Sequence, residues 1–144
     1  MENAEAFSVC SSHERMEKKI TVASDTKVYL MTSKLLDEIL DITPNLPRDY
    51  KYSFGSQMQN LTIGCLLTIQ RAFMFKKDRE DHLKEFLGDF DVLRTLVRKA
   101  GERQWISRKR HATIAELMSD IGKQVTAWKN HPSQGEGRNP GGQG

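Results

Sequence analysis

Four segments of the chain carry apolar residues at steps of three and four, the spacing that gathers side chains on one face of an α-helix. The segments cover about 25–42, 49–77, 79–101 and 107–129. The third has the strictest pattern, because its apolar steps alternate between three and four from Leu83 to Ala100. That alternation is the heptad spacing of left-handed helical bundles. We therefore expect an all-α fold.

The connections between the segments are short, and Pro44 and Pro47 end the first one. Long helices with short connections favour an antiparallel up-down-up-down four-helix bundle. The length of 144 residues suits one domain. The C-terminal tail is rich in Gly and Pro and lacks bulky apolar residues, so it should be disordered. We expect a flexible N-terminal arm at 1–24, the bundle at 25–130 and the tail at 131–144.

The second segment has more apolar residues than one inward stripe needs. A surplus stripe often marks a contact between subunits, and it predicts an oligomer interface. The alternative is that this helix is simply the most central of the four. Gly64 lies in the middle of the segment at a cost in helix stability, and it predicts the close approach of another helix backbone. The residues predicted for the interface are Leu61, Ile63, Leu66 and Leu67.

The sequence carries no pattern typical of an enzyme. It has no glycine-rich phosphate loop, no nucleophile-elbow motif and no paired-histidine zinc motif. Cys65 lies in an apolar run, which favours a buried core thiol over a nucleophile. His82 and Glu85 share a helix face at the spacing of di-metal bundles, but the inward positions of the other helices are apolar. We expect no catalytic residue, no metal site and no cofactor.

Positive charge is concentrated between the third and fourth segments, although the net charge is only +3. Three of these cations follow Ser107, a typical helix N-cap. A helix N-terminus already carries partial positive charge, so each cation there costs roughly a few tenths of a kcal/mol. A bound polyanion would compensate for that cost, because the capping amides and the side chains would all attract a phosphate. The candidate nucleic-acid-binding residues of this cluster are Arg94, Arg98, Lys99, Arg103, Arg108, Lys109 and Arg110.

Other interpretations of the basic residues stay open. The cations that end the third segment also complement a helix dipole, so a structural role is credible. A base could stack on Trp105 or an arginine could cover its face; the alternative is that Trp105 plugs the end of the bundle. A second cluster lies where the second segment turns into the third, at the opposite end of an up-down bundle, and it adds Arg71, Lys76, Lys77 and Arg79 as candidates. Known RNA-binding motifs are absent, so recognition would use shape and backbone charge.

The sequence has no mark of a membrane-spanning or secreted protein. No window holds about eighteen consecutive apolar residues, and the N-terminus lacks the apolar core of a signal peptide. The two cysteines do not form a disulfide framework or a metal knuckle. We expect a cytoplasmic location.

Several short motifs occur in order along 25–130. The first is LPRDYKYSFGSQM, which precedes an apolar helix. The others are Leu93-Arg94, Ile106-Ser107, Ile121-Gly122 and Trp128. In these motifs the chain resembles the Avd proteins, the accessory variability determinants of bacterial and phage diversity-generating retroelements. It is more loosely similar to related four-helix-bundle proteins encoded in ribosomal-RNA intervening sequences.

The resemblance implies a homopentamer of four-helix bundles without catalytic residues. It also implies that the chain binds the reverse transcriptase and the template-repeat RNA of its element, in support of adenine-mutagenic reverse transcription in a bacterial or phage-infected cell. The basic clusters at 94–110 and 71–79 would make these contacts. Avd proteins tend to be strongly basic, whereas acids in the third segment dilute the charge here. The alternative is a structural or interaction bundle of the intervening-sequence type, with no polymerase partner.

Overall fold

The computed structural model describes residues 23–131, with side chains from Lys27 onward, and this part of the chain contains no strand. The long helices are α2 (Ala23–Ile42), α4 (Phe54–Met74), α5 (Arg79–Glu102) and α6 (Arg108–Asn130). The connections contain the 3-10 turns η1 (Thr43–Asn45) and η2 (Lys76–Asp78) and the short helix α3 (Arg48–Lys51). The all-α fold is confirmed. Except for Ala23, Ser24 and His131, the predicted arm and tail lie outside the described residues.

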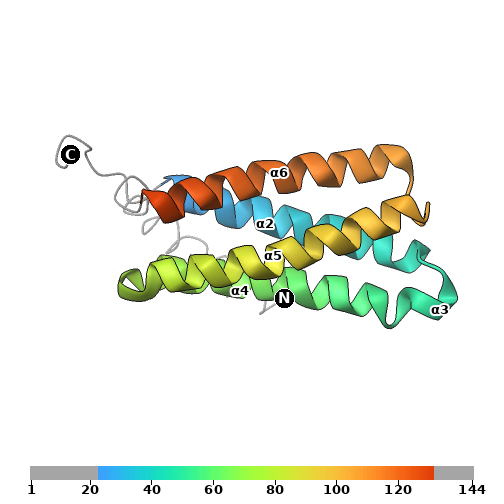
Figure 1. Ribbon diagram of the computed structural model, residues 1–144, viewed down its shortest axis with the longest axis horizontal. Helices are drawn as coiled ribbons and strands as arrows, with labels where there is room; N and C mark the ends of the chain where they lie inside the picture. The colour runs from blue at the N-terminus through green and yellow to red at the C-terminus, as the bar shows by residue number, and fades with distance from the viewer. Residues whose placement is uncertain (1–22, 132–144) are drawn as a thin grey trace, which may run out of the picture.

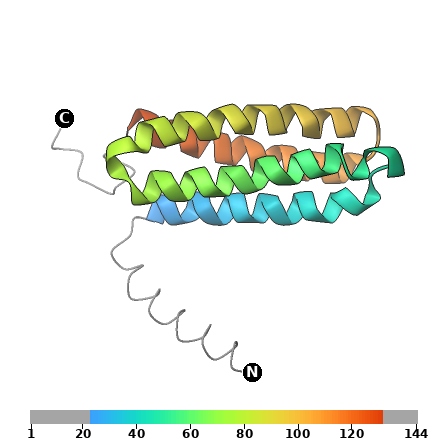
Figure 2. The same cartoon turned by 90° about the horizontal axis from the view of Figure 1, so that it is seen from below.

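The long helices are arranged in a ring. Each packs against the next along the chain, and α6 returns to pack against α2. Neighbouring helices run in opposite directions, which confirms the predicted up-down-up-down bundle (Figures 1 and 2). The α4–α5 connection lies at one end of the bundle, while α3 and the α5–α6 turn lie together at the other end (Figure 1). The two ends therefore carry different connections and different basic segments.

The apolar face of α5 forms a large part of the core. Its heptad residues are buried from Leu83 to Ala100, as predicted. Phe86 and Phe90 stack inside the bundle with their ring centroids 5.2 Å apart. Burying a large apolar side chain stabilises a fold by about 1.5–3 kcal/mol, so this seam holds α5 firmly between its neighbours. The apolar stripe of α6 is buried as well, with Leu117 partly so: Ile114, Met118, Ile121, Val125 and Trp128.

The single helix predicted over 49–77 is wrong. The structure has the short α3, a turn at Tyr52 and Ser53, and then α4, which ends at Met74. The connection after α2 packs tightly onto the first turn of α4, because a Cβ on Gly55 would lie 2.8 Å from Thr43 Cγ2. The chain therefore reaches α4 through a separate short helix at the end of the bundle. Apolar periodicity continued through this bend, so the sequence pattern did not reveal it.

The close helix contact predicted at Gly64 is also wrong. Among the described neighbours, the nearest atom to a Cβ built there is Asp89 Oδ2, at 3.8 Å. That is an ordinary van der Waals distance to a side chain, and no backbone of another helix comes as close. The crowded glycine is Gly101 instead, where a Cβ would lie 2.9 Å from the His111 ring.

Replacing Gly64 with alanine should stabilise the protein by about 0.5–1 kcal/mol, because alanine favours the helix and restricts the unfolded chain. Replacing Gly101 with alanine should destabilise it, since His111 occupies the space that the methyl group needs. Urea unfolding of both variants measures the two changes. Loss of stability in Gly64→Ala would show that another backbone does pack against this position.

Candidate nucleic-acid interface

The turn between α5 and α6 reverses the chain over a few residues. The Trp105 amide donates to the Ala100 carbonyl at 2.9 Å, and the Gln104 amide donates to the Gly101 carbonyl at 3.0 Å. This pair of bonds is a Schellman helix ending, which requires one residue in the left-handed conformation. Gln104 takes that position, with a φ of 60°. Glycine usually occupies it, so the sequence did not reveal how tightly the chain turns here.

Trp105 plugs the end of the bundle. Its ring stacks on Tyr50 of α3, with centroids 4.8 Å apart, and meets the edge of Phe54 at 5.3 Å. The guanidinium of Arg103 lies 5.3 Å from the Trp105 ring and 5.9 Å from the Tyr50 ring. Of the roles that the sequence left open for Trp105, the structure supports the plug, and an arginine lies over its ring as well. These contacts also tie α3 to the α5–α6 turn.

Ser107 is the N-cap of α6, as predicted. Its hydroxyl oxygen accepts a hydrogen bond from the Arg110 amide at 3.0 Å. The first turn of α6 contains no acidic residue, and its first two residues, Arg108 and Lys109, are exposed. The side-chain charges therefore add to the positive end of the helix dipole in a place open to solvent.

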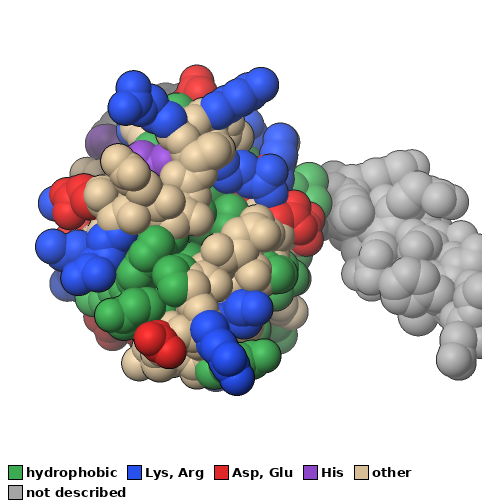
Figure 3. All heavy atoms as spheres, turned by 90° about the vertical axis from the view of Figure 1, so that its right-hand side faces the viewer, with side chains coloured by type: hydrophobic (Ala, Val, Ile, Leu, Met, Phe, Trp, Pro, Cys, Tyr) green, Lys and Arg blue, Asp and Glu red, His purple; other side chains and the backbone are tan. Residues whose placement is uncertain are grey.

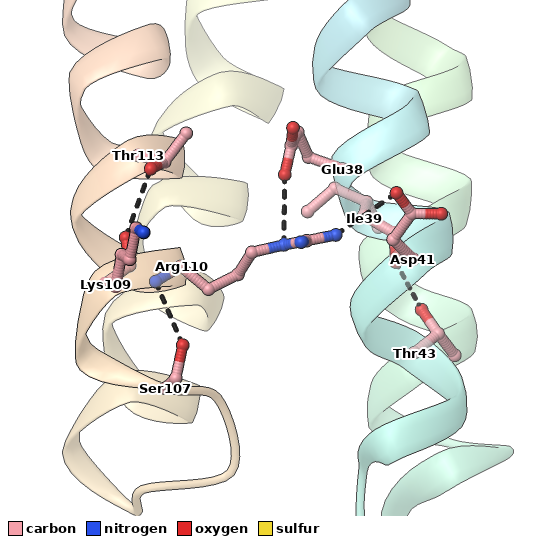
Figure 4. Close-up of polar contacts among 8 residues, drawn as sticks. All are labelled: Glu38, Ile39, Asp41, Thr43, Ser107, Lys109, Arg110 and Thr113. Carbon is pink, nitrogen blue, oxygen red and sulfur yellow. Dashed lines mark hydrogen bonds and ion pairs between the residues drawn. The ribbon is translucent and has the colours of Figure 1, made fainter.

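Arg110 has partners that the sequence did not reveal. Its Nε lies 3.1 Å from Glu38 Oε1, and its Nη2 donates to Asp41 Oδ2 at 3.1 Å (Figure 4). The Nε and Oε1 atoms are buried and attract each other as ions, although they lack the alignment of a hydrogen bond. Arg110 therefore links α6 to α2, and a contact between Arg110 and nucleic acid stays a prediction. The compensation that we expected from a ligand comes here from two carboxylates of α2.

The other cations of this cluster remain largely available. Lys99 lies 3.7 Å from Glu102 across the exposed surface of α5, a pair too weak to hold the lysine in place. Among the described residues, no carboxylate forms an ion pair with Arg98, Arg103, Arg108 or Lys109.

Sequence reasoning missed two cations that the fold adds to this end. Arg48 and Lys51 flank Tyr50 in α3, which the contact with Trp105 holds beside the α5–α6 turn. We call Arg48, Lys51, Lys99, Arg103, Arg108 and Lys109 the basic end. Seen along the bundle axis, Lys and Arg side chains surround an apolar patch here, and Asp and Glu are fewer (Figure 3).

Arg94 and Arg98 lie beside the basic end rather than on it. They line a cavity of about 870 Å³ between α5 and α6, together with Lys123 and His111. Arg94 also pairs with Asp91 at 3.1 Å, and both side chains are exposed. The cavity extends the positive surface along the side of the bundle.

The second basic cluster, at the opposite end of the bundle, is smaller than predicted. Arg71, Lys76 and Lys77 are exposed around the α4–α5 connection. Arg79 is 3% exposed, and its Nε donates to the Ala72 carbonyl at 2.7 Å. Its guanidinium also lies 4.9 Å from the Trp128 ring. Arg79 therefore caps the C-terminal end of α4 and packs against Trp128 of α6. Because its side chain is buried, its prediction as a surface contact is wrong.

Part of the predicted interface on α4 is exposed apolar surface, and its role as an interface stays a prediction. Ile63 is 44% exposed and Leu67 is 51% exposed, while Leu66 is half-buried. Leu61 packs against the core instead, as expected for a central helix. Met74, which is 57% exposed, continues the outer stripe.

Cys65 is buried in the core, as predicted. Burial, and secondarily the charge of Asp89, raises the pKa of the Cys65 thiol to about 12, so the sulfur is protonated at neutral pH and a poor nucleophile. Within residues 23–131, no group of three or more His, Cys, Asp or Glu side chains could hold a metal ion. Every helix in the same range is too short or too polar to cross a lipid bilayer.

A family model described as bAvd-like matches residues 22–132, which is most of the chain. The chain belongs to the bAvd-like family. No match is found among curated proteins. The family is an accessory rather than a catalytic one, so this bAvd-like chain is an accessory protein of a retroelement. The relation to intervening-sequence proteins stays a prediction.

Two of the motifs that carried the resemblance meet in the bAvd-like fold. A Cβ on Gly122 would lie 3.2 Å from Nη2 of Arg94, so the arginine lies directly against α6 at this glycine. Its guanidinium also lies 5.3 Å from the Phe90 ring. The small residue at 122 thus makes room for the arginine at the wall of the cavity.

Arg110→Ala should destabilise the bundle by about 1–2 kcal/mol, because Glu38 would lose its partner while staying half-buried. Lys109→Ala is the matched control, and it should change stability by less than about 0.5 kcal/mol. Adding Glu38→Gln to Arg110→Ala should restore part of the loss, since the glutamine carries no charge. Denaturant unfolding of the single and double variants measures this coupling. Equal losses for Arg110→Ala and Lys109→Ala would contradict the assignment.

Proposed function

We propose that this protein is a non-enzymatic subunit of a diversity-generating retroelement, which binds template RNA or its cDNA and the reverse transcriptase through basic surfaces and supports mutagenic reverse transcription. The observation that carries the proposal is the basic end, where exposed cations gather without enough carboxylates to neutralise them. Membership of the bAvd-like family gives the context of a retroelement.

Nucleic acid suits the basic end for electrostatic reasons. Phosphates displace counterions when they meet clustered Lys and Arg side chains, and this release drives binding at low salt. The first amides of α6 lie in the same turn as Arg108 and Lys109, and helix N-termini favour phosphate groups. Arg98 and Arg94 could contact further phosphates of a strand that continues along the α5–α6 cavity.

The opposite end supports a second contact. Arg71, Lys76 and Lys77 are exposed there, far along the bundle from the α5–α6 turn (Figure 1). One subunit could therefore engage RNA at one end and the polymerase, or a second stretch of RNA, at the other. Arg79 and Arg110 are not part of the proposal, because the fold already uses them.

The double variant Arg108→Ala/Lys109→Ala should bind template RNA about tenfold more weakly at low salt, and the slope of log affinity against log salt should fall by about 1–2. The reason is that two phosphate contacts would be lost. Stability should stay the same or rise slightly, since cations at a helix start are unfavourable. Fluorescence anisotropy over a salt series measures both quantities.

Lys34→Ala is the control for that experiment, because Lys34 is exposed on α2, away from the turn. It should leave the affinity and the salt slope unchanged. An unchanged slope in the Arg108/Lys109 variant would remove the basic end from the RNA site.

We also propose that the outer stripe of α4 joins copies of the chain into a homo-oligomer, a pentamer by the resemblance to Avd proteins. Ile63, Leu66 and Leu67 supply exposed or half-exposed apolar surface in the middle of the helix, and Met74 extends it. Apolar side chains in a continuous exposed stripe are typical of subunit contacts.

Ile63→Glu/Leu67→Glu should reduce the mass of the protein in solution to that of a monomer, because charges would be buried without partners in the interface. Val92→Glu on α5 is the matched control, since Val92 and Leu67 are both 51% exposed. Light scattering coupled to gel filtration measures the mass. If both variants keep the mass of the wild type, the interface lies elsewhere.

The alternative function is an interaction bundle with no polymerase partner. The apolar stripe of α4 supports it, because such a stripe serves protein contacts without any nucleic acid. Co-purification with the reverse transcriptase of the same element distinguishes the two functions. Recovery of the polymerase favours the accessory role, and its absence together with weak, salt-insensitive RNA binding favours the alternative.

A further inference from the structure

Tyr52 differs from the other aromatic residues at the basic end. Tyr50 and Phe54 both pack on Trp105, and the Tyr50–Trp105 contact holds α3 to the α5–α6 turn. Tyr52 follows the last residue of α3 and is 80% exposed, and its ring contacts no other aromatic ring or cation among the described residues. It therefore contributes little to the stability of the fold.

The segments next to Tyr52 carry more cations than carboxylates. Lys51 precedes it, and Arg48 lies at the start of the same short helix. Arg103 reaches over Tyr50, two residues away along the chain. Two carboxylates lie in the same region: Asp49 is an exposed residue of α3 itself, and Glu102 lies 3.7 Å from Lys99. An exposed ring beside cations is the combination that binds single-stranded nucleic acid, because the cations hold phosphates while a base stacks on the ring.

We propose that Tyr52 is a stacking platform for an unpaired base, so that the basic end selects single-stranded nucleic acid over a duplex. This inference rests on the proposed function and specifies its substrate class. A duplex keeps its bases stacked inside, where an isolated ring on a loop cannot reach a base face. An unpaired strand offers both the phosphate and the base, and its affinity gains from the ring without depending on base identity.

Trp105 does not take this role, because Tyr50 and Arg103 lie on its ring and Phe54 meets it edge-on. The platform is therefore on the turn that follows α3. Tyr50, Phe54 and Trp105 thus form part of the end of the bundle, whereas Tyr52 beside them is exposed to solvent.

The test uses the full chain and three labelled probes with the same number of phosphates: oligouridine, an abasic ribose-phosphate chain, and an RNA duplex. The wild type should bind oligouridine about tenfold more tightly than the abasic chain, because only the former can stack. Tyr52→Ala should remove this difference and leave the salt slope unchanged. Tyr52→Phe should behave as the wild type, since it keeps the ring.

Lys51→Ala is the matched charge control at the neighbouring position. It should lower the affinity for all three probes together and reduce the salt slope. Circular dichroism verifies that each variant is folded.

The outcomes separate this inference from the proposed function. Salt-dependent binding that is equal for oligouridine and the abasic chain, or unaffected by Tyr52→Ala, would overturn the stacking platform and leave the electrostatic proposal intact. Duplex binding as tight as that of oligouridine would also overturn it. If the wild type binds none of the probes at low salt, the proposed function fails and the inference fails with it.

Discussion

Burial of the α5 face between α4 and α6 determines where the charged residues of this protein can lie. The apolar seam from Leu83 to Ala100 leaves no space for charge inside the bundle, so cations are confined to the outer faces and to the two ends. The chain reverses direction at the two ends of the bundle. The helices begin and end there, so backbone amides and carbonyls without helical hydrogen-bond partners are present at both ends. Clustered cations, open amides and a compact aromatic plug therefore coincide at the α5–α6 turn.

The fold uses some cations for itself and leaves others exposed. Arg110 links α6 to α2 through Glu38 and Asp41, and Arg79 closes α4 beneath Trp128. Both are at least partly buried, and each has a partner from a different element. Arg108 and Lys109 stand next to Arg110 but extend into solvent at a helix start, where they oppose the helix dipole. Among the described residues, no carboxylate forms an ion pair with Arg108 or Lys109. A bound anion is the simplest explanation for cations that lower stability in this way.

The sequence predicted the bundle well, because heptad spacing and a serine N-cap are local signals. The buried face of α5 and the start of α6 at Ser107 follow directly from them. The partners of Arg110 were missed because they lie in a distant part of the chain. Asp41 and Arg110 are 69 residues apart, so a linear count of charges around Arg110 could not include its partners.

The basic end was predicted in part for the same reason. The cations of the α5–α6 turn are neighbours in sequence, whereas Arg48 and Lys51 join them only because α3 is separated from α4 and packs on Trp105. The apolar periodicity continues from α3 into α4, so the sequence pattern did not show that they are separate helices. A residue with positive φ is usually a glycine, but here it is Gln104. The sequence therefore gave no signal for the tight turn between α5 and α6.

Amide hydrogen exchange with and without template RNA tests the central claim most directly, because the amides of Arg108 and Lys109 lie in the first turn of α6, where helical partners are missing. The account predicts that bound RNA slows exchange in α3 and from Arg103 to Lys109, while the middle of α2 keeps its rate. Slower exchange confined to the middle of the bundle, or no change in these segments while RNA is bound, would contradict it.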